Sequence, residues 1–273
     1  MLIFNQNLLD FVSCFFLFTN NIVKLCNVDL SGTRGYWLCV IILSEGLTLG
    51  PFLGSLINLA AITIERYLKV VHHMWTKRML RKWMIYAVIP FAWIGGNVVA
   101  WGWTVPTTDV VDGVCYTLML WRSRAARLAF SIWYFLTFCV GLSLTFILCY
   151  GRILIVIRRQ AQLMAGHSVP GGSITTQTQS KKMQFQIIKT MLLVSMLYIV
   201  LWTPAYVHFI LMNIPTTLVV GDAAFYIVQV TGFLYNCANP FIYASKYDPV
   251  KRILLRLIPW NKNTQHSQSI EMT

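Results

Sequence analysis

The sequence predicts an all-α integral membrane protein, because it is too apolar for a water-soluble domain and its apolar residues fall into helix-length stretches. Of its 273 residues, 57% are hydrophobic and 11% are charged, and the mean hydropathy is +0.62. Soluble domains carry about a quarter charged residues. A bilayer-spanning helix needs about 20 predominantly apolar residues, and stretches of this kind recur along the chain. We therefore expect several membrane-spanning helices.

Six apolar stretches are the expected helices. They cover residues 1–19, 37–66, 83–104, 126–157, 185–213 and 223–244. The gaps between them are short, so successive helices should be antiparallel neighbours in one bundle. Within the longest gap, residues 160–180 are rich in Gly, Ser, Thr and Gln and lack hydrophobic periodicity. This segment is predicted to be a flexible loop.

The basic residues predict the topology. The net charge is +13, which in a soluble protein would suggest a nucleic-acid partner. Here the basic residues lie mostly between the apolar stretches, so no nucleic acid is expected. One set of alternate gaps holds five of them: Lys24, Arg34, Arg122, Arg124 and Arg127. The other set holds fifteen: Lys69, Lys77, Arg78, Arg81, Lys82, Arg152, Arg158, Arg159, Lys181, Lys182, Lys246, Lys251, Arg252, Arg256 and Lys262. The positive-inside rule places this second set, and both chain ends, in the cytoplasm beside anionic lipid.

A short amphipathic helix is expected after the last stretch, at about 249–259. Pro249 can occupy the first position of a helix, and the apolar residues that follow recur at helical spacing: Val250, Ile253, Leu254, Leu257 and Ile258. The segment is too short to span a bilayer, so it should lie in the cytoplasmic interface; docking on protein is the alternative. Residues 1–259 then form one bundle, and 260–273 form a cytoplasmic tail.

Polar residues inside the apolar stretches are candidates for function. Asp10 lies between Leu9 and Phe11, and a carboxylate at membrane depth is costly enough to suggest a role; alternatively, it marks the start of a helix. On the stretch 37–66, Ser55 and Thr48 share the helix face of Arg66 at about 100° per residue, and Glu45 lies about 60° from that line near the extracellular end. Ordinary contacts between helices explain such small polar groups equally well.

Glu65-Arg66-Tyr67 closes this stretch at its cytoplasmic end. Snorkelling would explain a single arginine there. An adjacent acid and base can also form an ion pair that breaks and frees the guanidinium for a partner helix.

Two prolines and a polar stripe mark the last two stretches. Pro204 and Pro240 each remove a backbone hydrogen bond and are expected to kink their helices. The stripe, spaced to face the bundle, consists of Gln229, Asn236, Asn239 and Tyr243.

Taken together, these residues resemble the rhodopsin-like (class A) G-protein-coupled receptors, from Met1 to about Pro259. Asp10, preceded by Leu8-Leu9, is similar to the second-helix Leu-x-x-Asp, and Glu65-Arg66-Tyr67 to the third-helix Asp/Glu-Arg-Tyr. The remaining matches are Trp93 for the fourth helix, Tyr150 for the fifth, Trp202-Thr203-Pro204 for the sixth, and Asn239-Pro240-Phe241-Ile242-Tyr243 for the seventh. The departures are Leu201, Leu142, Tyr235 and Asn236, where the family usually has Cys, Pro, Asn and Ser.

The resemblance implies that the six stretches are helices two to seven of a seven-helix bundle, with the first helix absent, and that 249–259 is helix eight. It implies a disulfide between Cys39 and Cys115, a plasma-membrane location, and a heterotrimeric G protein as partner. The implied coupling and switch residues are Glu65, Arg66, Tyr67, Tyr150 and Tyr243. The implied cavity for water or a sodium ion is formed by Asp10, Ser55, Trp202, Asn236 and Asn239.

The resemblance also implies a mechanism. An agonist near Trp202 should favour outward movement of the sixth helix about Pro204. Glu65 should hold Arg66 in the inactive state, and Tyr150 and Tyr243 should approach Arg66 in the active state.

The ligand is expected to be a peptide or an unidentified small molecule. Retinal is not expected, because Phe233 stands where retinal proteins of the family have a lysine, and a biogenic amine is not expected, because Thr48 stands where amine receptors have an aspartate. The candidate pocket residues are Glu45, Thr48, Trp133, Tyr134, Trp202, Tyr206, His208, Tyr226, Gln229 and Phe233. Core packing is the alternative explanation for the aromatic ones. The loop arginines Arg122, Arg124 and Arg127 attract an acidic ligand or form a solvated face.

Other classes of protein are less consistent with the sequence. An enzyme would need a nucleophile, metal site or phosphate loop, and no motif for one is present. A six-helix transporter or channel would predict internal symmetry or more intramembrane charge than Asp10 and Glu45 supply. A truncated receptor that no longer signals is the remaining alternative.

Overall fold

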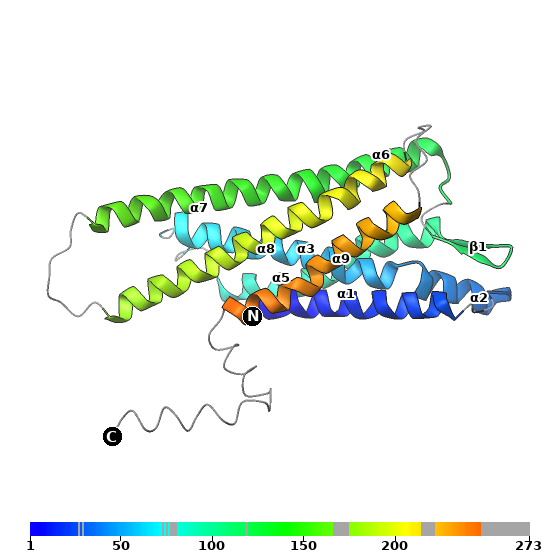
Figure 1. Ribbon diagram of the computed structural model, residues 1–273, viewed down its shortest axis with the longest axis horizontal. Coiled ribbons are helices and arrows are strands. Elements are labelled where there is room, and N and C mark those ends of the chain that lie inside the picture. Colours follow the sequence, from blue (N-terminus) through cyan, green and yellow to red (C-terminus); the bar gives the residue numbers. More distant parts are fainter. Residues whose placement is uncertain are drawn as a thin grey trace, which may run out of the picture.

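Long helices that run side by side make up most of the chain (Figure 1). The computed structural model describes residues 1–26, 28, 30–72, 74, 76, 81–117, 120–165, 175–213 and 222–246. The predicted amphipathic segment 249–259 and the tail 260–273 lie outside these residues. The elements are α1 Leu2–Leu25, α2 Gly32–Leu38, η1 Cys39–Leu43, α3 Gly46–Val71, α5 Lys82–Thr104, η2 Val105–Thr107, β1 Asp109–Val111, β2 Val114–Tyr116, α6 Arg124–Tyr134, η3 Phe135–Gly141, α7 Leu142–Ala165, α8 Thr175–Asn213 and α9 Asp222–Lys246.

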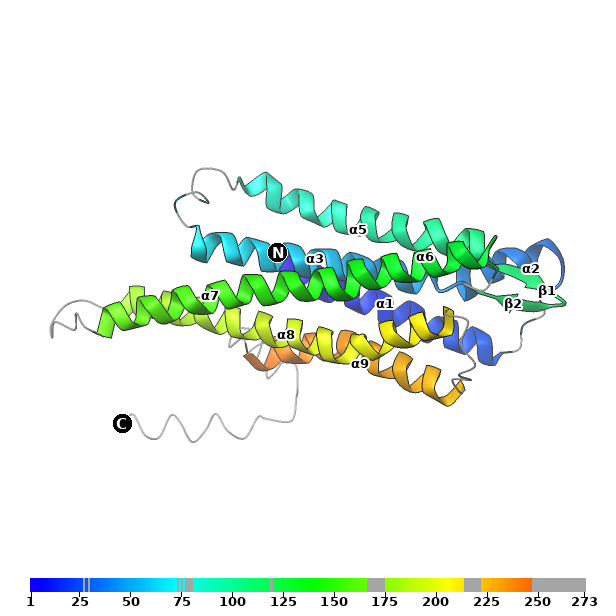
Figure 2. The same cartoon turned by 90° about the horizontal axis from the view of Figure 1, so that it is seen from above.

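The predicted membrane-spanning bundle is confirmed. Among the described residues, five helical segments are long and apolar enough to cross a bilayer: Leu2–Leu25, Gly32–Val71, Trp83–Thr107, Arg124–Gln160 and Phe185–Asn213. The sixth predicted stretch is α9, which packs against α8 and α1. Figure 2 shows α5 on one side of the bundle and α8 and α9 on the other, with α3 between them.

Helix α3 is the centre of the bundle. It packs against α5, α1 and α7, and its fully buried side chains include Phe52, Leu53, Leu56 and Leu59. The other helices keep large apolar side chains exposed, such as Phe11 on α1 and Ile147 on α7, as expected for surfaces that face lipid. The bundle has a disulfide end, where α2 and β1 lie, and an Arg66 end, where α7 ends and α8 begins (Figure 1).

Two predicted boundaries are wrong. Helix α1 continues beyond residue 19 to Leu25, because Asn21 and Thr19 satisfy their polar groups on the helix itself, donating to the carbonyls of Leu17 and Phe15. The predicted loop 160–180 is helical at both ends, since α7 runs to Ala165 and α8 starts at Thr175. Extending an existing helix adds one hydrogen bond per residue without a new nucleus, so neighbouring polar residues can join it.

The stretch 37–66 is not one regular helix. A π-helical segment, η1, precedes a break at Ser44 and Glu45, and Glu45 has a left-handed backbone with φ of 65°. Its carbonyl accepts the amides of Thr48 and Leu49 at 3.0 and 2.8 Å and so begins α3. The count back from Arg66 that placed Glu45 runs through uninterrupted helix as far as Gly46, and Glu45 is the N-cap residue that precedes it.

The helix formed by α6, η3 and α7 contains a second π-helical segment, Phe135–Gly141, which ends at Leu142. Such segments add a residue to a helical turn and redirect the side chains beyond it. Helices α8 and α9, in contrast, continue through Pro204 and Pro240 without a break.

Close packing of α3 on α5 depends on three glycines. A Cβ on Gly96 would lie 2.4 Å from the Gly50 carbonyl oxygen and 2.4 Å from the Gly54 nitrogen. Both are backbone atoms that cannot rotate away. Small residues of this kind allow membrane helices to approach closely.

Replacing Gly96 with alanine is therefore expected to lower stability by about 1–3 kcal/mol, the usual cost of overpacking. Thermal unfolding of the detergent-solubilised chain measures the change. Gly102→Ala is the matched control, because its Cβ would meet nothing within 4 Å. Equal melting temperatures for the two variants would contradict the packing described.

Candidate functional site

Asp10 is the centre of a buried polar network at the middle of the bundle. Its side chain is fully buried. Ser55 Oγ on α3 donates to Oδ1 at 2.5 Å, and Asn239 Nδ2 on α9 donates to Oδ2 at 2.7 Å. Gln6 Nε2, one turn earlier on α1, also donates to Oδ2, at 3.4 Å. The structure thus brings together Asp10, Ser55 and Asn239 from three helices.

The network extends through residues that the sequence analysis did not select. Gln6 Nε2 also donates to Ser55 Oγ, and Asn58 Nδ2 donates to Gln6 Oε1 at 2.9 Å. Asn5 Nδ2 donates to Asn58 Oδ1 at 3.1 Å, and Trp93 Nε1 on α5 donates to Asn5 Oδ1 at 3.0 Å. The spacing of Gln6, Asp10 and Ser13, which places them on one helix face, was the available signal.

Unpaired polar atoms accompany this network. Both side-chain amide atoms of Asn236, Oδ1 of Asn239 and Nε1 of Trp202 are buried without a hydrogen-bond partner among the described residues. Unpaired buried polar groups are unfavourable and call for water or an ion. Asn239 binds the Asp10 carboxylate through Nδ2, so its free Oδ1 suits a hard cation, which prefers oxygen ligands.

Trp202 links the network to a cavity. Its ring stacks on Phe52 of α3, with centroids 4.0 Å apart and an interplanar angle of 24°. It also meets Phe233 of α9 edge-on, at 5.8 Å. Because Phe52 lies three residues before Ser55, a displacement of Trp202 reaches α3 one turn from the network.

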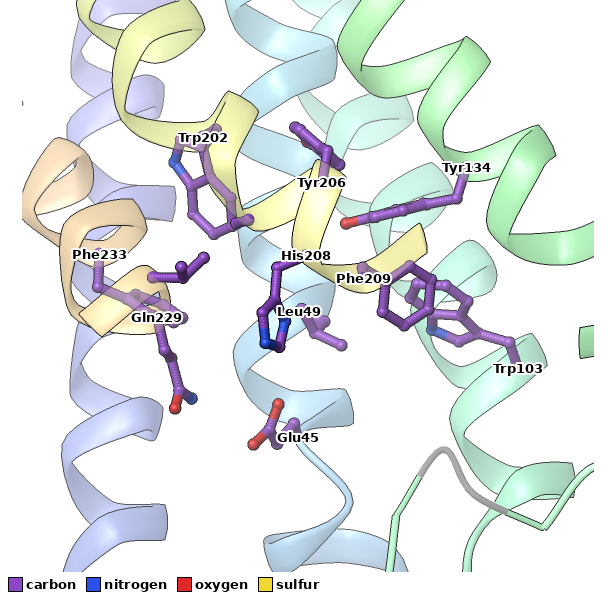
Figure 3. A pocket seen from close by; sticks show the side chains of 12 residues that line it. Glu45, Leu49, Trp103, Tyr134, Trp202, Tyr206, His208, Phe209, Gln229 and Phe233 are labelled. Carbon is purple, nitrogen blue, oxygen red and sulfur yellow. The ribbon is translucent and has the colours of Figure 1, made fainter. Parts of the chain in front are cut away.

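The cavity beside Trp202, the aromatic pocket, has a volume of about 150 Å³. Figure 3 shows Trp202 and Phe233 on one side of the pocket and Tyr134, Phe209 and Trp103 on the other. Glu45 lies at the lower edge of the pocket in this view, and the His208 ring is directed toward Glu45. The described lining is Glu45, Leu49, Trp103, Tyr134, Trp202, Ala205, Tyr206, His208, Phe209, Val228, Gln229 and Phe233. The pocket is apolar apart from a few groups, of which Glu45 is the only carboxylate in this described lining.

Seven of the predicted pocket residues lie in this lining: Glu45, Tyr134, Trp202, Tyr206, His208, Gln229 and Phe233. Two predicted residues do not. Trp133 is 46% exposed on the outer surface, and Thr48 is buried against α1, where its carbonyl accepts from Ser13 Oγ at 2.9 Å. The rotation of each helix decides which neighbour faces inward, and packing determines that rotation. The side chain of Tyr226 lies outside the described ones.

Five further residues of this lining were not predicted from the sequence: Leu49, Trp103, Ala205, Phe209 and Val228. Each belongs to an ordinary apolar stretch and carries no polar signal. Glu45 pairs with Lys24 of α1, at 3.4 Å between Nζ and Oε1, so the pocket's carboxylate already has a cationic neighbour.

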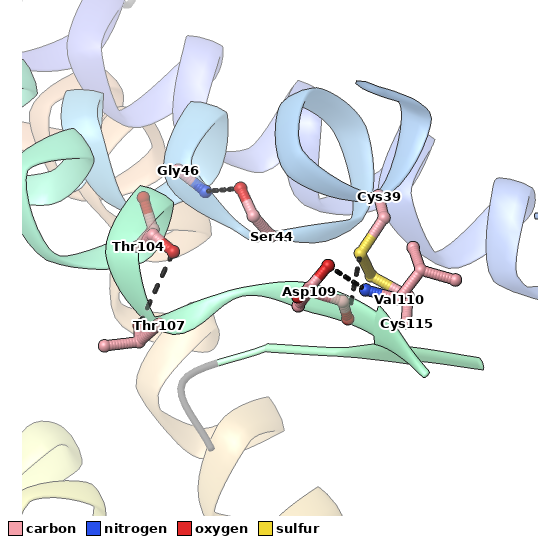
Figure 4. Close-up of a disulfide and its surroundings, with 8 residues drawn as sticks. All are labelled: Cys39, Ser44, Gly46, Thr104, Thr107, Asp109, Val110 and Cys115. Atoms are coloured by element: carbon pink, nitrogen blue, oxygen red, sulfur yellow. Dashed lines mark hydrogen bonds between the residues drawn. A yellow bond between two sulfur atoms is a disulfide. The ribbon is translucent and has the colours of Figure 1, made fainter. Parts of the chain in front are cut away.

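The predicted disulfide joins Cys39 and Cys115, with Cα atoms 5.6 Å apart (Figure 4). It ties η1 to strand β2, which pairs with β1 in an antiparallel hairpin. The hairpin is thereby held over the disulfide end of α3. The five described free cysteines are Cys14, Cys26, Cys139, Cys149 and Cys237.

Replacing Cys39 with serine opens a link that closes 76 positions, which the chain-entropy model values at about 4 kcal/mol. Thermal unfolding should show a large fall in melting temperature. Cys26→Ser, at an exposed free cysteine, should leave it unchanged. An unaltered melting temperature in Cys39→Ser would show that the hairpin does not depend on the link.

The pairing expected at the Arg66 end differs in the structure. Glu65 forms its ion pair with Lys69, not with Arg66, because residues four apart lie on one helix face whereas adjacent residues point about 100° apart. Nε of Arg66 is buried without a hydrogen-bond partner among the described residues. Tyr67 instead contacts His72, with its hydroxyl 3.3 Å from Nε2.

Tyr150 of α7 is near Arg66 along α3. Its hydroxyl lies 3.2 Å from Oγ1 of Thr63, one turn before Arg66, and its side chain is buried. The side chain of Tyr243, the other predicted switch tyrosine, lies outside the described ones.

Two tyrosines of α8 form a contact that the sequence analysis did not predict. The Tyr198 hydroxyl donates to the carbonyl of Phe138 at 2.5 Å and lies 2.9 Å from the Tyr206 hydroxyl. Phe138 belongs to the π-helical segment η3. This bond therefore joins α8, close to Pro204, to the irregular turn of the neighbouring helix.

A multi-pass helical bundle that holds an aromatic pocket beside a buried carboxylate network has the architecture of a membrane receptor. The chain belongs to the rhodopsin family of seven-transmembrane receptors, whose family model matches residues 1–243. It is 23% identical over 253 residues to sphingosine 1-phosphate receptor 1 of Danio rerio. This match covers 87% of the chain and 64% of the relative, so the chain spans about 64% of the length of this curated relative.

Proposed function

We propose that this receptor transmits the binding of an extracellular ligand to a heterotrimeric G protein. The observation that carries the proposal is the contact of Trp202 with both the aromatic pocket and Phe52, because one side chain then touches the ligand site and the helix that bears Arg66. In this proposal the disulfide end faces the oxidising exterior, and the Arg66 end, rich in basic residues, faces the cytoplasm at the plasma membrane.

The ligand we propose is a small amphiphile with a cationic group and an apolar body. The apolar and aromatic lining suits the body, and the carboxylate of Glu45 suits the cation. Thr48 supplies no carboxylate, but Glu45 does so at the end of the pocket nearer the disulfide. The ligand's cation would have to share Glu45 with Lys24 or displace it. The relative's name includes sphingosine 1-phosphate, which makes this amine-bearing phosphate ester a suitable first probe.

The switch we propose couples α8 to α3. Pro204 leaves α8 without one backbone hydrogen bond, and Tyr198 ties the same helix to η3. An agonist that moves Trp202 would shift the balance between two arrangements of α8, and it can do so only by binding one more tightly than the other. Arg66, whose Nε lacks a partner among the described residues, would donate hydrogen bonds to the bound G protein.

A sodium ion fits the group formed by Asp10, Ser55, Asn236 and Asn239, on the evidence of its free amide oxygens. We propose that these four residues hold the ion and that it supplies positive charge beside Asp10. Asp10 and Asn239, already joined by a hydrogen bond, would then keep α1 and α9 together in the inactive arrangement.

The test measures guanine-nucleotide exchange on purified G proteins of each class, using the purified chain in lipid nanodiscs with and without sphingosine 1-phosphate. Exchange above that of empty nanodiscs supports the receptor function, and no exchange with any class, with or without the probe, contradicts it.

For the ligand class, Glu45→Gln should reduce the potency of amine-bearing amphiphiles at least tenfold. Glu45→Asp is the matched control, because it keeps the charge and should retain most of the response. Equal potency at wild type and Glu45→Gln would contradict the role of Glu45.

A further inference from the structure

A second cavity lies at the disulfide end, between the start of α6 and the end of α8. Its volume is about 610 Å³. The described residues that line it are Trp121, Ser123, Arg124, Ala125, Arg127, Leu128 and Asn213. None of these lines the aromatic pocket. The two cavities are neighbours, because Asn213 Nδ2 donates at 2.7 Å to the carbonyl of Phe209, which lines the aromatic pocket.

Two guanidinium groups line this cavity. Arg124 and Arg127 are three residues apart on α6, so they share a helix face. Nε of Arg127 is buried and has no hydrogen-bond partner among the described residues. The two ion pairs found among those residues involve Lys24 and Lys69, so neither arginine is neutralised by them. Leaving a buried charged donor unpaired is unfavourable, which favours an acceptor from outside the chain.

The elements that line this cavity cannot supply that acceptor as a carboxylate. The sequence contains no Asp or Glu from 113 to 221, a range that includes all of α6, η3, α7 and α8. The helix α5, which contacts α6 through Trp103 and Phe130, has none either. The nearby hairpin holds Asp109, whose Oδ1 accepts the amide of Val110 at 2.8 Å, and Asp112, and neither aspartate is in the two ion pairs found among the described residues.

The backbone adds to the positive potential. Helix α6 begins at Arg124, and Ser123 accepts the amide of Ala126 at 3.1 Å as its N-cap. The remaining first-turn amides and the helix dipole favour an anion at this end.

We propose that this cavity, the arginine cavity, binds an oxyanionic group through the guanidinium groups of Arg124 and Arg127. Phosphate, sulfate and carboxylate share the required chemistry, because each presents oxygens that a guanidinium can bind in a bidentate manner. The cavity exceeds the size of a bare ion, and Trp121 and Leu128 provide an apolar wall. The group is therefore the acidic head of a larger molecule. This binding does not depend on signalling.

The test uses the purified full chain in a phosphate-free maltoside detergent and follows the ³¹P line width of inorganic phosphate and of phenyl phosphate. Saturable broadening is expected for both, with tighter binding of phenyl phosphate because its ring reaches the apolar wall. Competition by sulfate and by acetate separates the oxyanions that the site accepts. No saturable broadening with either phosphate would overturn the proposal.

Three arginine variants make the test specific. Arg124→Gln and Arg127→Gln should each weaken binding at least tenfold, whereas Arg122→Gln removes the same charge from the same loop but outside the cavity and should bind as the native chain does. Arg124 is exposed, so its variant remains informative if Arg127→Gln disturbs folding. Equal weakening in Arg122→Gln and Arg124→Gln would show a general electrostatic effect and overturn the site.

Discussion

Guanine-nucleotide exchange should fall to the level of empty nanodiscs when Arg66 is replaced by alanine, while ligand binding at the aromatic pocket is largely retained. The reason is that Nε of Arg66 is buried at the Arg66 end without a partner among the described residues, so its donors are available to an entering helix. The aromatic pocket shares no described residue with this end. Exchange and probe binding are measured on the same preparation.

The control for this variant is Arg34→Ala. Arg34 is exposed on α2 at the opposite end. Its replacement removes the same charge without altering the proposed G-protein contact, so exchange should persist. Normal exchange in Arg66→Ala, with the protein correctly folded, would refute the proposed role of Arg66. Because Glu65 pairs with Lys69, removing Glu65 is no longer expected to release Arg66.

Sodium should lower basal exchange relative to potassium at equal ionic strength, and Asp10→Asn should abolish this difference. The substitution keeps the size of the side chain and removes its charge, which the proposed ion needs as its counter-charge. A sodium ion that binds the inactive arrangement more tightly than the active one lowers the fraction of receptor in the active arrangement. Basal exchange measured across a sodium titration reports the effect.

Glu45→Gln is the matched control, because it removes the carboxylate of the aromatic pocket, which lies outside the Asp10 network, and should leave the sodium response intact. The same sodium response in Asp10→Asn and in the unaltered chain would contradict an ion at Asp10. An unaltered chain whose basal exchange does not change with sodium would also contradict an ion at Asp10.

Much of the fold could be predicted from the sequence because the bilayer imposes a local rule. A spanning segment must satisfy its own backbone and be apolar over its whole length, so composition alone located the helices, including α3 and α5. The disulfide pair followed from the resemblance. Asp10 could be selected because a carboxylate in an apolar stretch is rare. Its partners Gln6 and Asn58 could not, because each is an ordinary polar residue until the packing brings them together.

The tertiary structure decided the properties that depend on how each helix is rotated and where it is interrupted. Tyr134 faces the aromatic pocket and Trp133 faces outward, although both are aromatic and adjacent. The break at Glu45 places a carboxylate at the pocket edge, whereas the pairing of Glu65 with Lys69 follows the local four-residue spacing of a helix. The sequence by itself determined which segments enter the membrane, since the transfer of each apolar segment into lipid depends on its own residues. The contacts between helices decided which side chains meet, since each contact joins residues far apart along the chain and no local pattern records it.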